Sequence, residues 1–213
     1  MFNTCVSLLF VLSFSLYSNN DKDLEVFSEN LASEGFQFFG IPKGAEDVPT
    51  SNTQKEKMFL YILNQARKEK NMQPLMLVQD LNRAARYHSY DMASQGYFEH
   101  DTYDINDTTG MLDYVCSAYD RITKFINSDY YERYKHNRIP LKWDGIKKWD
   151  FSSYGAENCA RGNVTALDAY NAWYNSPGHY ANMFNPDFKV IGIGYIQLPG
   201  SKYTHYWTTD FGI

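Results

Sequence analysis

Two histidines and one glutamate occupy positions from which their side chains could meet in a common cleft. His100 comes shortly after Gly96, which ends a predicted helix, and His179 follows another predicted helix. Glu157 lies between them in the run GAENCA from Gly155 to Ala160, whose small residues permit a close backbone approach. Two imidazoles and a carboxylate match a zinc site with an open coordination position, or a general acid/base cluster around one water. Chain position alone leaves a third interpretation open, which is three unconnected polar surface residues.

Another histidine, His88, lies on the apolar stripe of the predicted helix that Gly96 ends. A single histidine in such a stripe is more often a buried residue with a satisfied hydrogen bond than a ligand. Asp91, three residues further along the helix, is its expected hydrogen-bond partner. We therefore predict a structural role for His88.

Several common signatures of function are missing from the sequence. The motifs GxSxG, GxxxxGK[ST] and HExxH do not occur, and neither does a paired CxxC. Hydrolase-elbow, P-loop, zincin and zinc-ribbon interpretations therefore have no local support. With Lys+Arg 20 against Asp+Glu 25, the net charge of -5 has the wrong sign for a nucleic-acid or anionic-membrane surface. We expect no nucleic-acid partner.

The N-terminus has the length and pattern of a secretory signal. Val6 to Leu16 is an unbroken run of apolar and small residues, followed by the polar run from Ser18 to Asp21. This run is too short to span a bilayer, and no later segment approaches ~18 continuous apolar residues. We therefore expect residues 1–18 to be a signal peptide, the mature protein to be secreted or extracellular, and no transmembrane anchor to follow.

Export would affect the cysteines and two asparagines. Removal of the signal would leave Cys116 and Cys159, an even number that an oxidising compartment tends to join in a disulfide. Two unrelated buried thiols are the alternative. Asn106 and Asn163 each begin an N-glycosylation triplet, which is usable only if the chain is exported.

Three helices are expected to position these residues. The first is predicted over Gln54–Lys70, and the second ends at Gly96 with the apolar stripe that carries His88. The third ends at the Ser-Pro-Gly run from Ser176 to Gly178, and a short helical turn can follow it. The expected N-terminal caps of the three helices are a Thr53–Glu56 capping box, Asp80 and Thr165.

The rest of the chain divides into a tail, an excursion and a hairpin. Residues 19–53 contain several Gly and Pro residues and are expected to form a docking tail and linker before a domain over residues 54–213. Between Asp101 and Tyr154 we expect a long, partly ordered excursion with short helical turns at Met111–Ala118 and Arg121–Ile126. Lys189–Leu198 and Tyr203–Phe211 predict a β-hairpin. Helices against a sheet indicate an α+β layered domain.

A series of short motifs gives these residues a family context. The series resembles the CAP superfamily, the SCP domain of cysteine-rich secretory proteins, antigen 5 and pathogenesis-related 1 proteins, in its short bacterial-like branch. The resemblance extends over about residues 54–212. The motifs are His88 to Ala93, Tyr97 to His100, Gly155 to Asn158, Ala172-Trp173, Ser176 to His179, Ile191 to Tyr195 and Trp207 to Gly212.

The resemblance implies a three-layer α-β-α sandwich with a central cleft. It also implies that His100, Glu157 and His179 are three members of a His/Glu tetrad that binds zinc or another divalent cation in some relatives. Ser176, three residues after Trp173, stands where the family pattern has a glutamate. The loss of that carboxylate leaves fewer ligands and less negative charge for a metal ion.

The leading functional hypothesis is a secreted protein that binds a ligand rather than catalysing a reaction. The cleft residues include no paired nucleophile and orienting group. The expected ligands are a lipid or sterol, a divalent cation, or an extracellular protein partner. One alternative is a metal-dependent hydrolase or protease, with Glu157 as base and His100 and His179 holding zinc. A structural extracellular interaction module is the other alternative.

Overall fold

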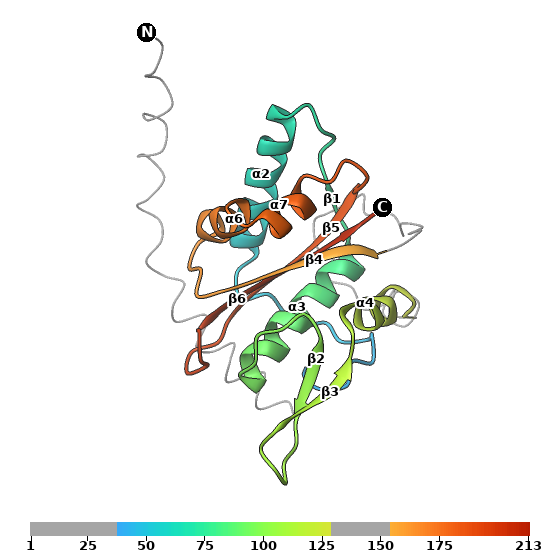
Figure 1. The fold of residues 1–213 in the computed structure, drawn as a ribbon, viewed down its shortest axis with the longest axis vertical. Coiled ribbons are helices and arrows are strands. Elements are labelled where there is room, and N and C mark those ends of the chain that lie inside the picture. Colours follow the sequence, from blue (N-terminus) through green and yellow to red (C-terminus); the bar gives the residue numbers. More distant parts are fainter. Residues whose placement is uncertain (1–37, 129–153) are drawn as a thin grey trace. The chain divides into compact units, whose positions relative to one another are not determined.

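A four-stranded sheet lies at the centre of the structure, a computed structural model that describes residues 38–128 and 154–213 (Figure 1). The β5–β6 pair is the predicted C-terminal hairpin, which is confirmed. Strand β1 runs parallel to β5, and the other neighbouring strands are antiparallel. In spatial order the strands are β1 (Met76–Leu77), β5 (Val190–Gln197), β6 (His205–Gly212) and β4 (Tyr154–Arg161).

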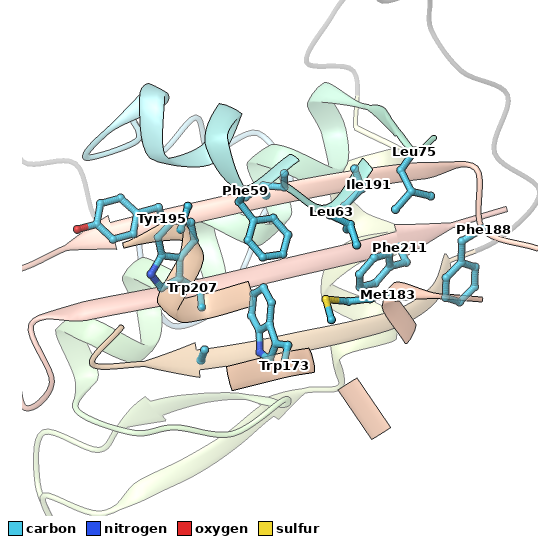
Figure 2. Close-up of a cluster of buried hydrophobic side chains, with 14 residues drawn as sticks. Phe59, Leu63, Leu75, Trp173, Met183, Phe188, Ile191, Tyr195, Trp207 and Phe211 are labelled. Atoms are coloured by element: carbon cyan, nitrogen blue, oxygen red, sulfur yellow. The ribbon is translucent and has the colours of Figure 1, made fainter. Parts of the chain in front are cut away.

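One face of the sheet carries an apolar core beneath three helices, α2 (Thr53–Glu69), α6 (Ala166–Tyr174) and α7 (Pro177–Met183). Side chains alternate along a strand, so every second residue of β5 and β6 enters this core. Figure 2 shows the rings of Phe59, Trp173 and Trp207 gathered over the strands, together with aliphatic neighbours from α2 and β5. The rings of Phe59 and Trp173 meet edge to face at 5.1 Å.

The opposite face of the sheet is covered by α3 (Gln79–Gln95), and α4 (Ala118–Ile126) contacts both α3 and β4. Glycines in β5 permit the close approach of α3. A Cβ atom on Gly194 would lie 2.3 Å from the carbonyl carbon of Ala85. The layers are therefore helix, sheet and helix, and the predicted α+β, three-layer α-β-α sandwich is confirmed.

A separate two-stranded sheet joins α3 to α4. Strand β2 (Thr102–Ile105) pairs antiparallel with β3 (Leu112–Cys116). The helical turn expected over Met111–Ala118 is therefore wrong, because cross-strand pairs such as Tyr103 with Tyr114 stabilise a hairpin instead. The turn expected over Arg121–Ile126 is confirmed as part of α4. The remainder of the expected excursion, residues 129–153, lies outside the described residues, as does the expected signal peptide.

The caps of the helices follow the sequence in part. Thr165 and Asp168 form a capping box at α6, and Gly96 ends α3 in the left-handed region with φ 72°. The cap of α2 is Asn52, because the Glu56 carboxylate pairs with Arg86 on α3 instead of closing a box with Thr53. Asp80 also caps no helix. It lies inside the first turn of α3 and forms an ion pair with Arg83.

The chain before the first predicted helix packs against α3. The backbone N–H of Gly40 donates to Asp91 Oδ1 at 2.9 Å, and Tyr87 Oη donates to the Gly40 carbonyl at 2.9 Å. Arg83 Nε donates to the Glu46 carbonyl at 3.1 Å, and Val48 is fully buried. Described residues from Phe38 onward therefore belong to the same compact unit as the domain expected to begin at residue 54.

Candidate functional site

Glu157 lies at the centre of a buried polar network between β4 and α3. Its side chain is 1% exposed, and each carboxylate oxygen accepts a hydrogen bond. His100 Nδ1 lies 2.9 Å from Oε1, and Arg121 Nη2 lies 2.5 Å from Oε2. His100 reaches the carboxylate from the segment after α3, while 56% of its own side chain is exposed. The structure thus brings two of the three predicted site residues together.

Arg121 is a member of the network that sequence analysis missed. Its side chain is fully buried, and the guanidinium also donates to the His100 carbonyl at 3.0 Å and to Thr102 Oγ1 at 2.9 Å. Arginine is almost never fully buried without a partner, so a lone arginine in a helix is usually taken for a solvated residue. The neighbouring apolar pair Ile122 and Phe125 indicated which face of α4 is buried, but not that Arg121 shares it.

The charges of this network stabilise one another. Burial alone would raise the pKa of Glu157, but the charge of Arg121, with His88 and His100, lowers it well below its ordinary value. Burial would lower the pKa of Arg121, and the Glu157 carboxylate raises it instead. The hydrogen bond that His100 donates to the Glu157 carboxylate raises the pKa of His100. Glu157 and Arg121 are therefore both charged at neutral pH.

His88 is fully buried on α3, as its position in the apolar stripe predicted. Its Nε2 lies 2.9 Å from the Glu99 carbonyl oxygen and 3.9 Å from Glu157 Oε1. The predicted hydrogen bond between His88 and Asp91 is wrong, because the Asp91 carboxylate accepts hydrogen bonds from the Gly40 backbone, Gln95 and Tyr97 instead. Burial first, and then Arg121, lower the pKa of His88 to about 3. His88 is therefore a neutral neighbour of the charged pair.

His179 lies near the beginning of α7, close enough to His100 for the two imidazoles to interact electrostatically. Its backbone carbonyl accepts a hydrogen bond from Asn158 Nδ2 at 3.2 Å, and its ring centroid lies 6.5 Å from that of Trp173. Burial and the charge of His100 lower the pKa of the half-buried imidazole. Among the described residues, no hydrogen bond or ion pair joins this imidazole to Glu157 or His100.

Cys116 and Cys159, which were expected to form a disulfide, are both free buried thiols in the structure. Cys159 Sγ lies 3.5 Å from Glu157 Oε1 and 3.9 Å from Thr208 Oγ1, so it packs into the polar network. Cys116 instead lies opposite Thr102 in the β2–β3 hairpin. Burial and the Glu157 charge raise the pKa of the Cys159 thiol, which therefore stays protonated.

Asp210 adds a second buried carboxyl beside Glu157. The two residues are partners in the β4–β6 register, and Asp210 is fully buried. Neither of its carboxyl oxygens has a hydrogen-bond partner within residues 38–128 and 154–213. Burial and the charge of Glu157 raise its pKa well above the ordinary value. Two carboxylates this close cannot both ionise at low cost, so Asp210 is the neutral member.

The donor atoms in this network do not fit a resident divalent cation. Among the described residues, His88, Glu157 and Cys159 form a group whose candidate ligand atoms lie within 4.8 Å of one another. Both Glu157 oxygens are already engaged, one of them by a guanidinium. His88 Nε2 contacts the Glu99 carbonyl, which accepts and cannot donate, so this nitrogen carries the proton and the lone pair is on Nδ1, which has no hydrogen-bond partner among the described residues.

The comparison with known proteins identifies the family. Residues 60–211 match the CAP family, described as the cysteine-rich secretory protein family. The match covers most of the chain, so the protein belongs to this family, as the motif series predicted.

Two kinds of relatives add to this result. The uncharacterized protein YkwD of Bacillus subtilis (strain 168) is 30% identical over 164 residues, which are 77% of this chain and 49% of that protein. The chain thus spans about half the length of this relative. An outer surface protein from Borrelia burgdorferi has a similar structure, with a TM-score of 0.52 and 19% identity over 75% of this chain and 92% of that chain. This second likeness supports the fold alone.

A further solved structure in this group is an extracellular protein containing a SCP domain from Bacillus anthracis str. Ames. Its TM-score is 0.48 at 22% identity, over 76% of this chain and 41% of that chain.

Within the part of the chain that the structure describes, none of the helices combines the length and the apolar character that a membrane span requires.

Proposed function

We propose that the protein is an exported CAP-domain binding protein and that its ligand is a lipid or sterol. The observation that carries this proposal is the closed network around Glu157. Both carboxylate oxygens accept hydrogen bonds, and a buried guanidinium balances the charge. Such an arrangement stabilises the polar network and leaves no activated acid or base at its centre. Export is supported by the apolar N-terminal run of Val6 to Leu16.

The protonation states of the network oppose catalysis by its buried members. A general base works best with a pKa near the operating pH, and Arg121 holds the pKa of Glu157 far below neutrality. A cysteine nucleophile acts as the thiolate, whereas burial keeps the Cys159 thiol protonated. Neither Glu157 nor Cys159 is therefore poised to attack a substrate.

The surface of α6 and α7 supports an apolar ligand. An aromatic cluster of Tyr170, Tyr174, Tyr180 and Phe184 runs across these helices, with Tyr180 and Phe184 ring centroids 4.5 Å apart and Tyr174 and Tyr180 centroids 5.2 Å apart. Tyr174 is 41% exposed, so the cluster is accessible. Exposed aromatic rings can contact an apolar body while their polar tips stay in water. Lys70 lies over two of the rings and could pair with an anionic headgroup.

The test is retention of radiolabelled cholesterol and palmitate by the purified protein. We expect the wild type to retain one of them and Tyr174→Ala in the aromatic cluster to lose about tenfold in affinity, since burying one aromatic side chain contributes on the order of 1–3 kcal/mol. Tyr114→Ala is the matched control, because this tyrosine is also exposed but lies on the β2–β3 hairpin. If the wild type retains neither lipid, the proposal is wrong.

One observation favours a second candidate, a hydrolase that uses His100. The half-exposed imidazole is oriented by the Glu157 carboxylate, which is how a general base is held in many hydrolases. This version predicts ester or peptide hydrolysis that falls about 100-fold or more in His100→Ala. Turnover that is the same in the variant and the wild type would exclude it.

A further inference from the structure

The guanidinium of Arg121 supplies a positive charge directly beside the buried Glu157 carboxylate. It contacts Glu157 Oε2 at 2.5 Å, while His100 contacts the other oxygen. His88 and Cys159 lie on the same carboxylate, at 3.9 Å and 3.5 Å from Oε1. The positive charge of Arg121 is thus on one oxygen of the carboxylate, while His100, His88 and Cys159 approach the other oxygen.

Other arginine–carboxylate pairs of the structure do not share this setting. Arg86 pairs with Glu56 between α3 and α2, and that carboxylate also accepts from the Tyr195 backbone. Arg83 pairs with Asp80 in the first turn of α3. Among the described residues, neither pair belongs to a group of metal-ligating side chains. Among these pairs, only Arg121–Glu157 includes a member of such a group.

We propose that Arg121 is a built-in cation that takes the place of a divalent metal ion, so that the polar network around Glu157 is complete without zinc. The proposal concerns the charge of this network and stands whichever ligand the protein binds. Arg121 is held firmly in this role, because it also donates to the His100 carbonyl and to Thr102 Oγ1. It therefore joins α4, the segment after α3 and β4 through one side chain.

Electrostatics and geometry both support this assignment. A divalent cation on Glu157 would lie within a few ångströms of a fixed positive charge in a buried site, where repulsion between like charges is strong. It would also have to displace the hydrogen bonds that engage both carboxylate oxygens. Ser176, where the motif series leads one to expect an acid, provides no compensating negative charge.

The test is a zinc titration of the full-length protein at pH 7.5, followed by calorimetry and by thermal unfolding. We expect no zinc-dependent shift in the melting temperature of the wild type. Arg121→Met should gain one, a rise of about 5–10 °C at a zinc concentration near 100 times its Kd. The gain should disappear in Arg121→Met/Glu157→Gln, because the freed carboxylate is the expected ligand.

Two controls make the result specific. Arg121→Lys keeps a positive charge and should show no zinc-dependent shift. Arg86→Met removes the guanidinium of another ion pair, away from the metal-ligating side chains, and should not gain zinc binding either. A folded Arg121→Met variant that gains no zinc binding would overturn the proposal.

The wild type provides a test that does not depend on whether Arg121→Met folds. Zinc binding by the wild type that His100→Ala and Glu157→Gln both abolish would show a working metal site and overturn the proposal. The lipid measurements above use a different ligand and a different surface, so a failure of that proposal is distinguishable from a failure of this one.

Discussion

The two faces of the central sheet are built from opposite kinds of residues. On the α2–α6–α7 face, β5 and β6 contribute Ile191, Ile193 and Trp207 to an apolar core. On the α3 face, β4 and β6 contribute Glu157 and Asp210, both buried, to a polar network. The same strands supply both faces, because successive side chains point in opposite directions.

The difference shows that the two faces of the sheet are stabilised in different ways. The apolar face is stabilised by burial and packing, which depend on volume more than on the partner's identity. The polar face is stable only while each charge keeps its partner, since an unpaired buried charge is costly. A change on the polar face should therefore be rescued by a second change there, whereas a cavity on the apolar face should not.

The largest effect should come from breaking the Arg121–Glu157 pair. Arg121→Met and Glu157→Gln should each destabilise the protein by about 3–5 kcal/mol, because each leaves one uncompensated buried charge. The double variant should lose less than the sum of the two, by about 0.5–3 kcal/mol. Urea unfolding of the four proteins measures this interaction. Losses that simply add would show that the two residues act independently.

On the apolar face, Trp173→Ala should cost about 3–5 kcal/mol through the cavity that it leaves. The indole also donates to the Cys159 carbonyl at 2.9 Å, so that bond is lost as well. The stability losses of Trp173→Ala and Arg121→Met should simply add in the double variant, because the two side chains lie on opposite faces of the sheet. Urea unfolding of the single and double variants checks this, and strong non-additivity would contradict the separation of the faces.

A smaller effect is expected where α3 meets the sheet. Gly194→Ala places a methyl group 2.3 Å from the carbonyl carbon of Ala85, so α3 must shift, at a cost of about 1–3 kcal/mol. Gly178→Ala is the matched control, since no atom lies within 4 Å of its added Cβ. It should be neutral or slightly stabilising. Equal unfolding midpoints for the two variants would disprove the tight contact.

The smallest expected effect is a pH dependence of the stability that comes from His100, the exposed member of the polar network. The pKa of His100 is raised above 6.5 by its bond to Glu157, so the folded state holds this proton more tightly than the unfolded state. The protonated His100 therefore stabilises the folded state fully below pH 6.5, and this stabilisation is lost as the pH rises through the pKa of the folded state. Wild-type stability should therefore fall relative to His100→Gln from pH 6 to pH 8.5, measured by urea unfolding.

His88 provides a check on the sign of that effect. Its pKa is lowered to about 3, so the folded state resists protonation and stability falls as the pH drops below 6.5. His100→Gln retains His88 and should lose stability in acid as the wild type does. A wild-type protein whose stability relative to His100→Gln is constant from pH 6 to pH 8.5 would show that the His100–Glu157 bond is not formed.

Local signals predicted the elements that depend on neighbours in the chain. The Thr165 cap, the Gly96 stop and the C-terminal hairpin agree with the structure, because each depends on residues within a few positions. The predicted caps at Thr53 and Asp80 failed for the opposite reason. Glu56 and Asp80 each bind an arginine of α3 instead of closing a cap, and the Glu56 pairing joins two helices.

The site was predictable only in part. The motif series implied that His100, Glu157 and His179 lie together, and a hydrogen bond joins the first two. Arg121 was not predicted, because its partner lies 36 residues away and no local pattern marks a buried arginine. Asp210 was missed as well, since its position beside Glu157 depends on the β4–β6 register.

By itself, the sequence determined the family, the three main helices and the C-terminal hairpin, because periodicity, helix stops and turn residues act over short distances. The tertiary structure alone decided the charge of the buried polar network around Glu157. Packing of α3 and α4 against the sheet brings Arg121 to Glu157 and buries both, and only burial makes their pairing obligatory. A long-range contact between buried charges depends on the whole fold, and so it leaves no mark in the local sequence.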